Sequence, residues 1–136
     1  MFALAANGFN KPSETFIRTH AQHLAPGRTL LIAERRGRRI PIDVPLIMYS
    51  KRWPIIVHQN ASTASLIYSI MSPSRFLKSR DAYLASTMQD FDVKTLMAEY
   101  GPTAMNLLEA TRIAGCRLFV HFHGVDASKM LNDAGI

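Results

Sequence analysis

The chain has 136 residues, of which 48% are hydrophobic and 19% are charged. This length and balance predict one globular domain and exclude a disordered chain. No apolar run approaches the ~18 residues that a membrane-spanning helix needs. The apolar stretch 1–6 is short and lacks the basic residues of a signal peptide.

The net charge of +6 raises the question of an anionic partner. The densest basic cluster, Arg35, Arg36, Arg38 and Arg39, brackets Gly37, so a solvated turn between strands is the simpler interpretation. An anionic lipid surface or a phosphorylated ligand is the alternative. Interleaved aromatic residues and recognised nucleic-acid-binding motifs are missing, so we expect no nucleic-acid partner.

A single cysteine, Cys116, cannot form an internal disulfide. It stands at the start of an apolar run, where we expect a buried, unreactive thiol. This cysteine usage fits a reducing, cytoplasmic compartment.

In the first half of the chain, residues 2–6 and 29–33 are continuous apolar runs that predict buried strands. Ser13 is expected to cap the helix between them, and Glu14 then lies in its first turn, where the helix dipole favours negative charge. The segment that follows contains two prolines, which favours an edge strand at residues 46–49.

The second half continues the alternation of helices and strands. The expected elements are helices at 61–71 and 74–88, a strand at 93–98, a helix opened by Pro102 and closed by Gly115, a strand at 117–122, and a short helix near Asp126. The pattern predicts an α/β fold with a Rossmann-like parallel sheet, right-handed crossovers and helices on both faces.

Three strand-to-helix junctions carry unusual sequence, at residues 7–14, 99–102 and 121–126. The carboxyl ends of parallel strands share one edge of a sheet, so we expect Gly8, Glu99 and His123 to lie along that edge and to form a single crevice. The helix N-terminus after the first junction suits a phosphate or carboxylate group. Gly8 stands alone, however, so this junction does not match a dinucleotide fingerprint.

The segment LFVHFHGVD, residues 118–126, is the most informative of the three. Its apolar start predicts a strand buried on both faces. His123 is then a candidate ligand contact, and Asp126 is expected to cap the next helix while remaining compatible with a substrate contact. Glu99 either binds a ligand hydroxyl or only ends its strand.

The histidines give a weak metal signal. We expect only one of His121 and His123 to face a given side of the strand, and no third ligand accompanies them in the sequence. His20 lies on the apolar side of the first helix, which favours a partly buried, hydrogen-bonded histidine. Paired cysteines, an HExxH motif and a Walker lysine are all missing, so we expect no metal and no cofactor.

Three segments together resemble one family. NGFNKPSETFIRTHAQHL at 7–24, LMAEYGPTA at 96–104 and LFVHFHGVDAS at 118–128 are similar, in order and spacing, to the N-terminal domain of family-4 retaining glycosyltransferases. Pro12 immediately before Ser13 departs slightly from the commonest spacing. The resemblance implies the GT-B architecture, in which an acceptor-side domain and a nucleotide-sugar domain face a cleft.

The resemblance also implies roles for residues. His123 would approach the transferring sugar as the catalytic residue. The substrate-binding positions would be Gly8, Ser13, Glu14, Glu99, Tyr100, Gly124 and Asp126. The implied partners are a nucleotide-sugar donor and a sugar or lipid-linked acceptor, without a metal, at the cytoplasmic face of an anionic membrane.

The chain ends at Ile136, and the resemblance spans only the first part of the N-terminal domain. We therefore expect residues 1–136 to form a partial domain that is inactive alone, without the nucleotide-sugar domain, and prone to self-association. A non-catalytic module that binds an acceptor or carbohydrate is the alternative.

Overall fold

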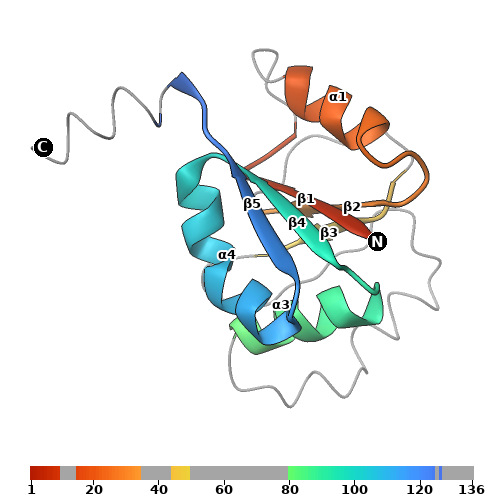
Figure 1. The fold of residues 1–136 in the computed structure, drawn as a ribbon, viewed down its shortest axis with the longest axis vertical. Helices are drawn as coiled ribbons and strands as arrows, with labels where there is room; N and C mark the ends of the chain where they lie inside the picture. The colour runs from red at the N-terminus through yellow and green to blue at the C-terminus, as the bar shows by residue number, and fades with distance from the viewer. Residues whose placement is uncertain (10–14, 35–43, 50–79, 125, 127–136) are drawn as a thin grey trace, which may run out of the picture.

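The computed structural model describes residues 1–9, 15–34, 44–49, 80–124 and 126. Five strands form one all-parallel sheet in the order β3-β2-β1-β4-β5 (Figure 1). They are β1 (Phe2–Ala6), β2 (Thr29–Ala33), β3 (Leu46–Met48), β4 (Thr95–Glu99) and β5 (Arg117–His121). The predicted α/β class with a Rossmann-like parallel sheet is confirmed.

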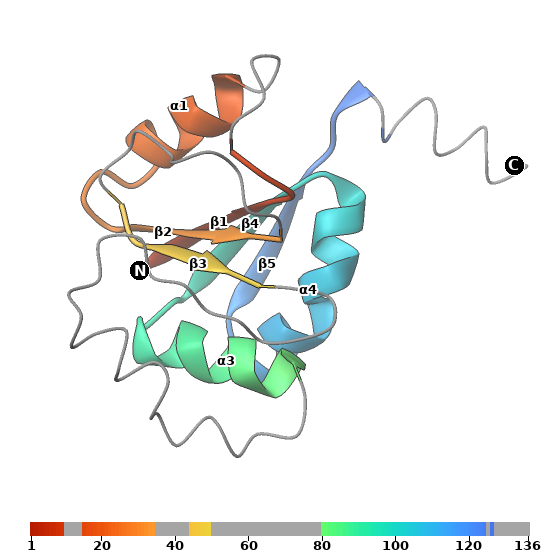
Figure 2. The same cartoon turned by 180° about the vertical axis from the view of Figure 1, so that it is seen from behind.

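Helices cover both faces of this sheet, also as predicted. Helix α1 (Thr15–His23) lies on one face, and α3 (Arg80–Asp90) and α4 (Gly101–Ala114) lie on the other, as Figures 1 and 2 show from opposite sides. Among the described residues, no helix has the length and apolar character required to cross a membrane.

Each face of the sheet packs its own apolar cluster, because successive strand residues point to opposite sides. Leu4 and Leu31 pack with Ile17 and Ala21 of α1. Neighbouring strand residues point the other way and pack with the two remaining helices; this second cluster includes Leu30, Ile32, Leu96, Leu84, Met88 and Leu107. The large side chains in both clusters are almost fully buried, so the sheet is held from both sides.

Several helix and strand boundaries agree with those predicted from the sequence. Strands β1 and β2 have the predicted bounds, and β3 lies at the sheet edge, as the preceding prolines indicate. Gly115 ends α4 in the left-handed conformation with φ 72° and donates its backbone N–H to the carbonyl of Arg112. The predicted helix 61–71, the start of helix 74–88 and the basic cluster 35–39 lie outside the described residues.

Two predictions about strands are corrected. Strand β4 begins later than expected and includes Glu99 as its last residue. The run before His121 is not buried on both faces: β5 is an edge strand among the described residues, and Phe119 is 54% exposed. The apolar character of this run gave no information on whether a second strand or a helix would cover it.

The alternation along β4 fixes the direction of Glu99. Leu96 and Ala98 belong to the cluster on the α3 and α4 face, and so Glu99 points to the α1 face. His121 is the register partner of Glu99 on β5, so the two side chains leave the sheet on the same side. The fold thus directs a carboxylate and an imidazole toward α1 at the carboxyl end of the sheet.

Candidate functional site

Three junctions meet at one edge of the sheet, as predicted. Gly8 follows β1, Glu99 ends β4 and His123 follows β5, and these three strands are parallel neighbours. Strand order reverses between β1 and β4, which is the position where open α/β sheets bind ligands. Gly8 is partly exposed with open space around it, whereas Ser13 and Glu14 lie outside the described residues.

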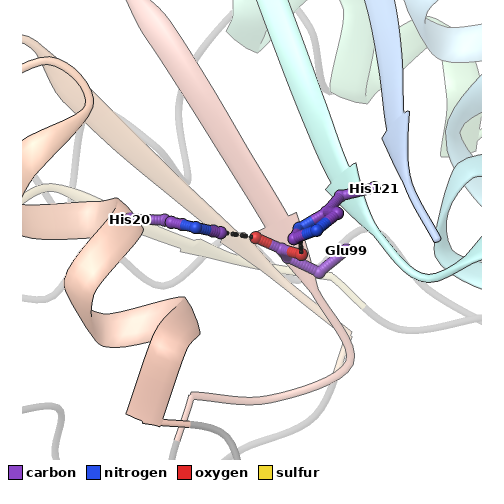
Figure 3. A group of neighbouring side chains, drawn as sticks. All are labelled: His20, Glu99 and His121. Carbon is purple, nitrogen blue, oxygen red and sulfur yellow. Dashed lines mark hydrogen bonds and ion pairs between the residues drawn. The ribbon is translucent and has the colours of Figure 1, made fainter. Parts of the chain in front are cut away.

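The centre of this edge is the carboxylate of Glu99, which is 0% exposed. Its Oε1 atom lies 2.6 Å from Nδ1 of His20. Its Oε2 atom lies 2.9 Å from Nδ1 of His121 and 2.9 Å from Nε2 of His123. Figure 3 shows His20, from α1, and His121, from β5, pointing at Glu99 from opposite sides. Three imidazoles, one from α1 and two from the end of β5 and the residues that follow it, therefore converge on one buried acidic group.

The contacts also determine which nitrogens carry protons. An ionised carboxylate only accepts hydrogen bonds, so each nitrogen that faces it acts as a donor. His20 and His121 then donate through Nδ1–H, and His123 donates through Nε2–H. In a neutral His123 the Nδ1 atom is left as an acceptor, and among the described residues no hydrogen bond occupies it. Glu99 thus fixes the tautomer of the residue expected to contact ligand.

Two aromatic rings pack beside the imidazole of His123. The ring centroids of Phe16 and Tyr100 each lie 4.4 Å from that of His123, with tilted planes. Tyr100 adopts a φ of 75°, an uncommon conformation for a residue other than glycine. Such outliers cluster at functional sites, where the surrounding structure maintains them. His123 is therefore held by ring packing as well as by its hydrogen bond to Glu99.

Asp126 braces the segment after β5. Its Oδ2 atom accepts the backbone N–H of His123 at 3.0 Å, as the third helical residue does in a capping box. Its Oδ1 atom accepts the backbone N–H of Gly101, at the start of α4, at 3.3 Å. The expectation that Asp126 caps the helix that follows it concerns residues outside the described ranges. Because its buried carboxylate accepts the backbone N–H groups of His123 and Gly101, Asp126 positions His123. Gly124, by contrast, is exposed.

The expectation that His121 and His123 face different sides is wrong. Residues two apart on an extended chain share a face, and both imidazoles contact the same oxygen of Glu99. His20 is partly buried and hydrogen-bonded, as expected, but sequence reasoning missed its partner 79 positions away. The histidine that follows SETFI was the available signal.

The sequence pattern showed no third potential metal ligand near His121 and His123, whereas the fold brings His20 and Glu99 beside His121. One ligand atom from each of His20, Glu99 and His121 lies within 4.8 Å of the other two. Imidazole nitrogens with a carboxylate oxygen form a donor set suited to zinc and related ions.

The comparisons with known proteins are negative. No family model, no curated protein and no solved structure matches this chain.

Proposed function

We propose that this chain forms the acceptor-side part of a retaining glycosyltransferase, with His123 contacting the sugar that is transferred. The observation that carries the proposal is the environment of His123, which stands at the carboxyl edge of the sheet with its Nε2–H donated to Glu99 and the rings of Phe16 and Tyr100 packed beside it. Its Nδ1, which accepts no hydrogen bond from the described residues, suits a sugar hydroxyl, and the adjacent rings suit the apolar face of a sugar.

Each surrounding group has a physical task in this proposal. Glu99 orients His123 and selects its tautomer, and Asp126 holds its backbone. A positioned imidazole acts at low entropic cost, because its rotamer is fixed before the ligand arrives. The donor nucleotide would bind a second domain, as the family resemblance implies, so these residues supply acceptor positioning and one contact to the sugar.

A titration with separate ligands tests this proposal. Nucleotide-sugars, free sugars and lipid-linked sugars are each added to the tag-free protein in a calorimeter. The variant His123→Gln retains an amide N–H near the position of Nε2 and removes the Nδ1 acceptor. We expect it to weaken binding of the sugar ligand at least ~10-fold, in line with the loss of a hydrogen bond in a polar site.

The exposed His23 on α1 provides the matched control, since it lies outside the group formed by Glu99, His20, His121 and His123. His23→Gln should bind as the wild type does. Equal binding by His123→Gln, or no saturable binding of any of these ligands by the wild type, contradicts the proposal.

A carbohydrate-binding module without catalysis is the second candidate. It is favoured by the same observation, because the contacts around His123 bind and orient a group without needing a donor. Saturable binding of a sugar or lipid-linked sugar, with no binding of any nucleotide-sugar in the presence or absence of that ligand, supports this module. Binding of a nucleotide-sugar that is lost in His123→Gln supports the transferase part, since His123 would then contact the sugar that is transferred.

A further inference from the structure

The Glu99 cluster has a property that sugar binding does not use. His20 and His121 approach the carboxylate from two sides through Nδ1, and neither imidazole contacts His123 through a hydrogen bond. Their side chains are 25% and 43% exposed, so this side of the cluster is open to solvent, whereas the carboxylate itself is 0% exposed. Solvent therefore reaches both imidazoles, and opening of their two hydrogen bonds would give a small ion access to the carboxylate.

We propose that His20, Glu99 and His121 bind one divalent transition-metal ion, with Zn²⁺ as the preferred ion. Two imidazoles and a glutamate are a ligand set used by zinc sites that keep a fourth position for water or substrate. Nitrogen donors disfavour Mg²⁺ and Ca²⁺, which select oxygen ligands. The proposal goes beyond sugar binding and does not depend on it.

The geometry is close to what the ion requires. The three ligand atoms lie within 4.8 Å of one another. Two atoms bound to one Zn²⁺ at ~2.0–2.1 Å are at most ~4.2 Å apart, and about 3.4 Å apart in a tetrahedron. The two hydrogen-bonded pairs, at 2.6 and 2.9 Å, must open slightly to admit the ion. Side-chain movements below about 1 Å are sufficient for both adjustments.

Binding also leaves the number of protons on the cluster unchanged. The ion replaces the two Nδ1 protons that face Glu99, and each imidazole then carries its proton on Nε2, which releases no net proton from a neutral ring. The buried carboxylate gains a cation in place of two hydrogen bonds. His123 keeps its Nε2–H on Oε2 of Glu99 and orients the ligating carboxylate, as outer hydrogen-bond partners do in metal sites.

The test compares metal affinity among matched variants. The tag-free chain is treated with a chelator, dialysed and titrated with Zn²⁺ in a calorimeter. Co²⁺ is added in a parallel sample, because its visible absorption reports nitrogen ligands and coordination number. We expect one ion per chain for the wild type.

Asparagine is the informative replacement at both ligand positions. Its amide N–H lies near the position of Nδ1, so His20→Asn and His121→Asn can keep the hydrogen bond to Glu99 while removing the metal ligand. We expect each variant to weaken Zn²⁺ binding at least ~100-fold, and His123→Gln, an outer position, to weaken it ~10-fold or less. His23→Asn should leave the affinity unchanged.

Thermal unfolding without metal shows that each variant is folded before it is titrated. No Zn²⁺ binding by the wild type overturns the proposal. It is equally overturned if His20→Asn and His121→Asn bind as tightly as the wild type, or if His23→Asn loses the same affinity. Because no sugar is present, these results are separate from the test of His123 as a sugar contact.

Discussion

Replacing Glu99 by glutamine tests whether the buried carboxylate stabilises the fold. The variant Glu99→Gln keeps the size and shape of the side chain and removes its charge. Three imidazole N–H groups donate to this carboxylate in the wild type. After the change one oxygen is left to accept, and the amide N–H₂ faces an imidazole that must change tautomer to receive it.

The size of the effect follows from these contacts. A hydrogen bond to a charged group contributes a net ~1.5–3 kcal/mol, roughly twice that of a neutral one. Three such bonds weakened to neutral ones amount to ~2–4 kcal/mol. The imidazoles are 18–43% exposed, so water replaces part of the loss and the contributions are not additive. We expect Glu99→Gln to lower the free energy of unfolding by about 1–3 kcal/mol.

Urea unfolding followed by circular dichroism measures this difference, with a chelator present to exclude bound metal. A domain of this size should show a midpoint shift with an unchanged m-value. The midpoint temperature of thermal unfolding should fall by roughly 3–5 °C for each kcal/mol of stability lost. Glu109→Gln is the control, because Glu109 is exposed and its ion pair with Arg112 is exposed too, and it should leave the midpoint unchanged.

A Glu99→Gln variant as stable as the wild type, or more stable, would refute this reasoning. It would mean that the cost of burying the charge exceeds the strength of its three hydrogen bonds, as occurs in some buried ion pairs. Glu99 and its three histidines would then serve ligand binding and would lower the stability of the fold.

Three further predictions concern the surrounding fold. Gly115→Ala should lower the free energy of unfolding in urea by about 1 kcal/mol, because Gly115 has a φ of 72° that an alanine adopts only with strain, although no atom lies near the added Cβ. Gly8→Ala is the control and should have little effect, since Gly8 has no positive φ. Equal effects of the two substitutions would contradict this prediction. Burial raises the pKa of the Cys116 thiol, so its thiolate fraction at pH 8 is reduced. Alkylation by iodoacetamide should therefore be slower in the folded chain than in urea, and it should accelerate as the pH rises. Equal alkylation rates in the folded and the urea-unfolded chain would show that the pKa of this thiol is not raised. Phe119 is 54% exposed on β5, an edge strand among the described residues, so the wild type should self-associate as its concentration rises. In sedimentation velocity, Phe119→Ser should shift the chain toward the monomer. A wild type that stays monomeric at high concentration would contradict this prediction.

The sequence alone determined the bounds of several elements and the parallel direction of the strands. Apolar runs of five residues identified β1 and β2, and the proline and glycine that flank α4 identified its ends, because each signal depends on neighbouring residues only. The alternation of strands and helices gave the parallel sheet, and parallelism placed Gly8, Glu99 and His123 at one edge.

Only the tertiary structure decided what these residues do to one another. His20 and Glu99 are 79 positions apart, and their contact depends on the direction in which β4 presents its last side chain to α1. The edge position of β5 likewise depends on which strands pair, and this left Phe119 exposed despite an apolar run. Side-chain convergence depends on strand order and register, which are long-range properties. Residue pattern and spacing therefore identified Glu99 and His123 as candidates without revealing that Glu99 joins three histidines.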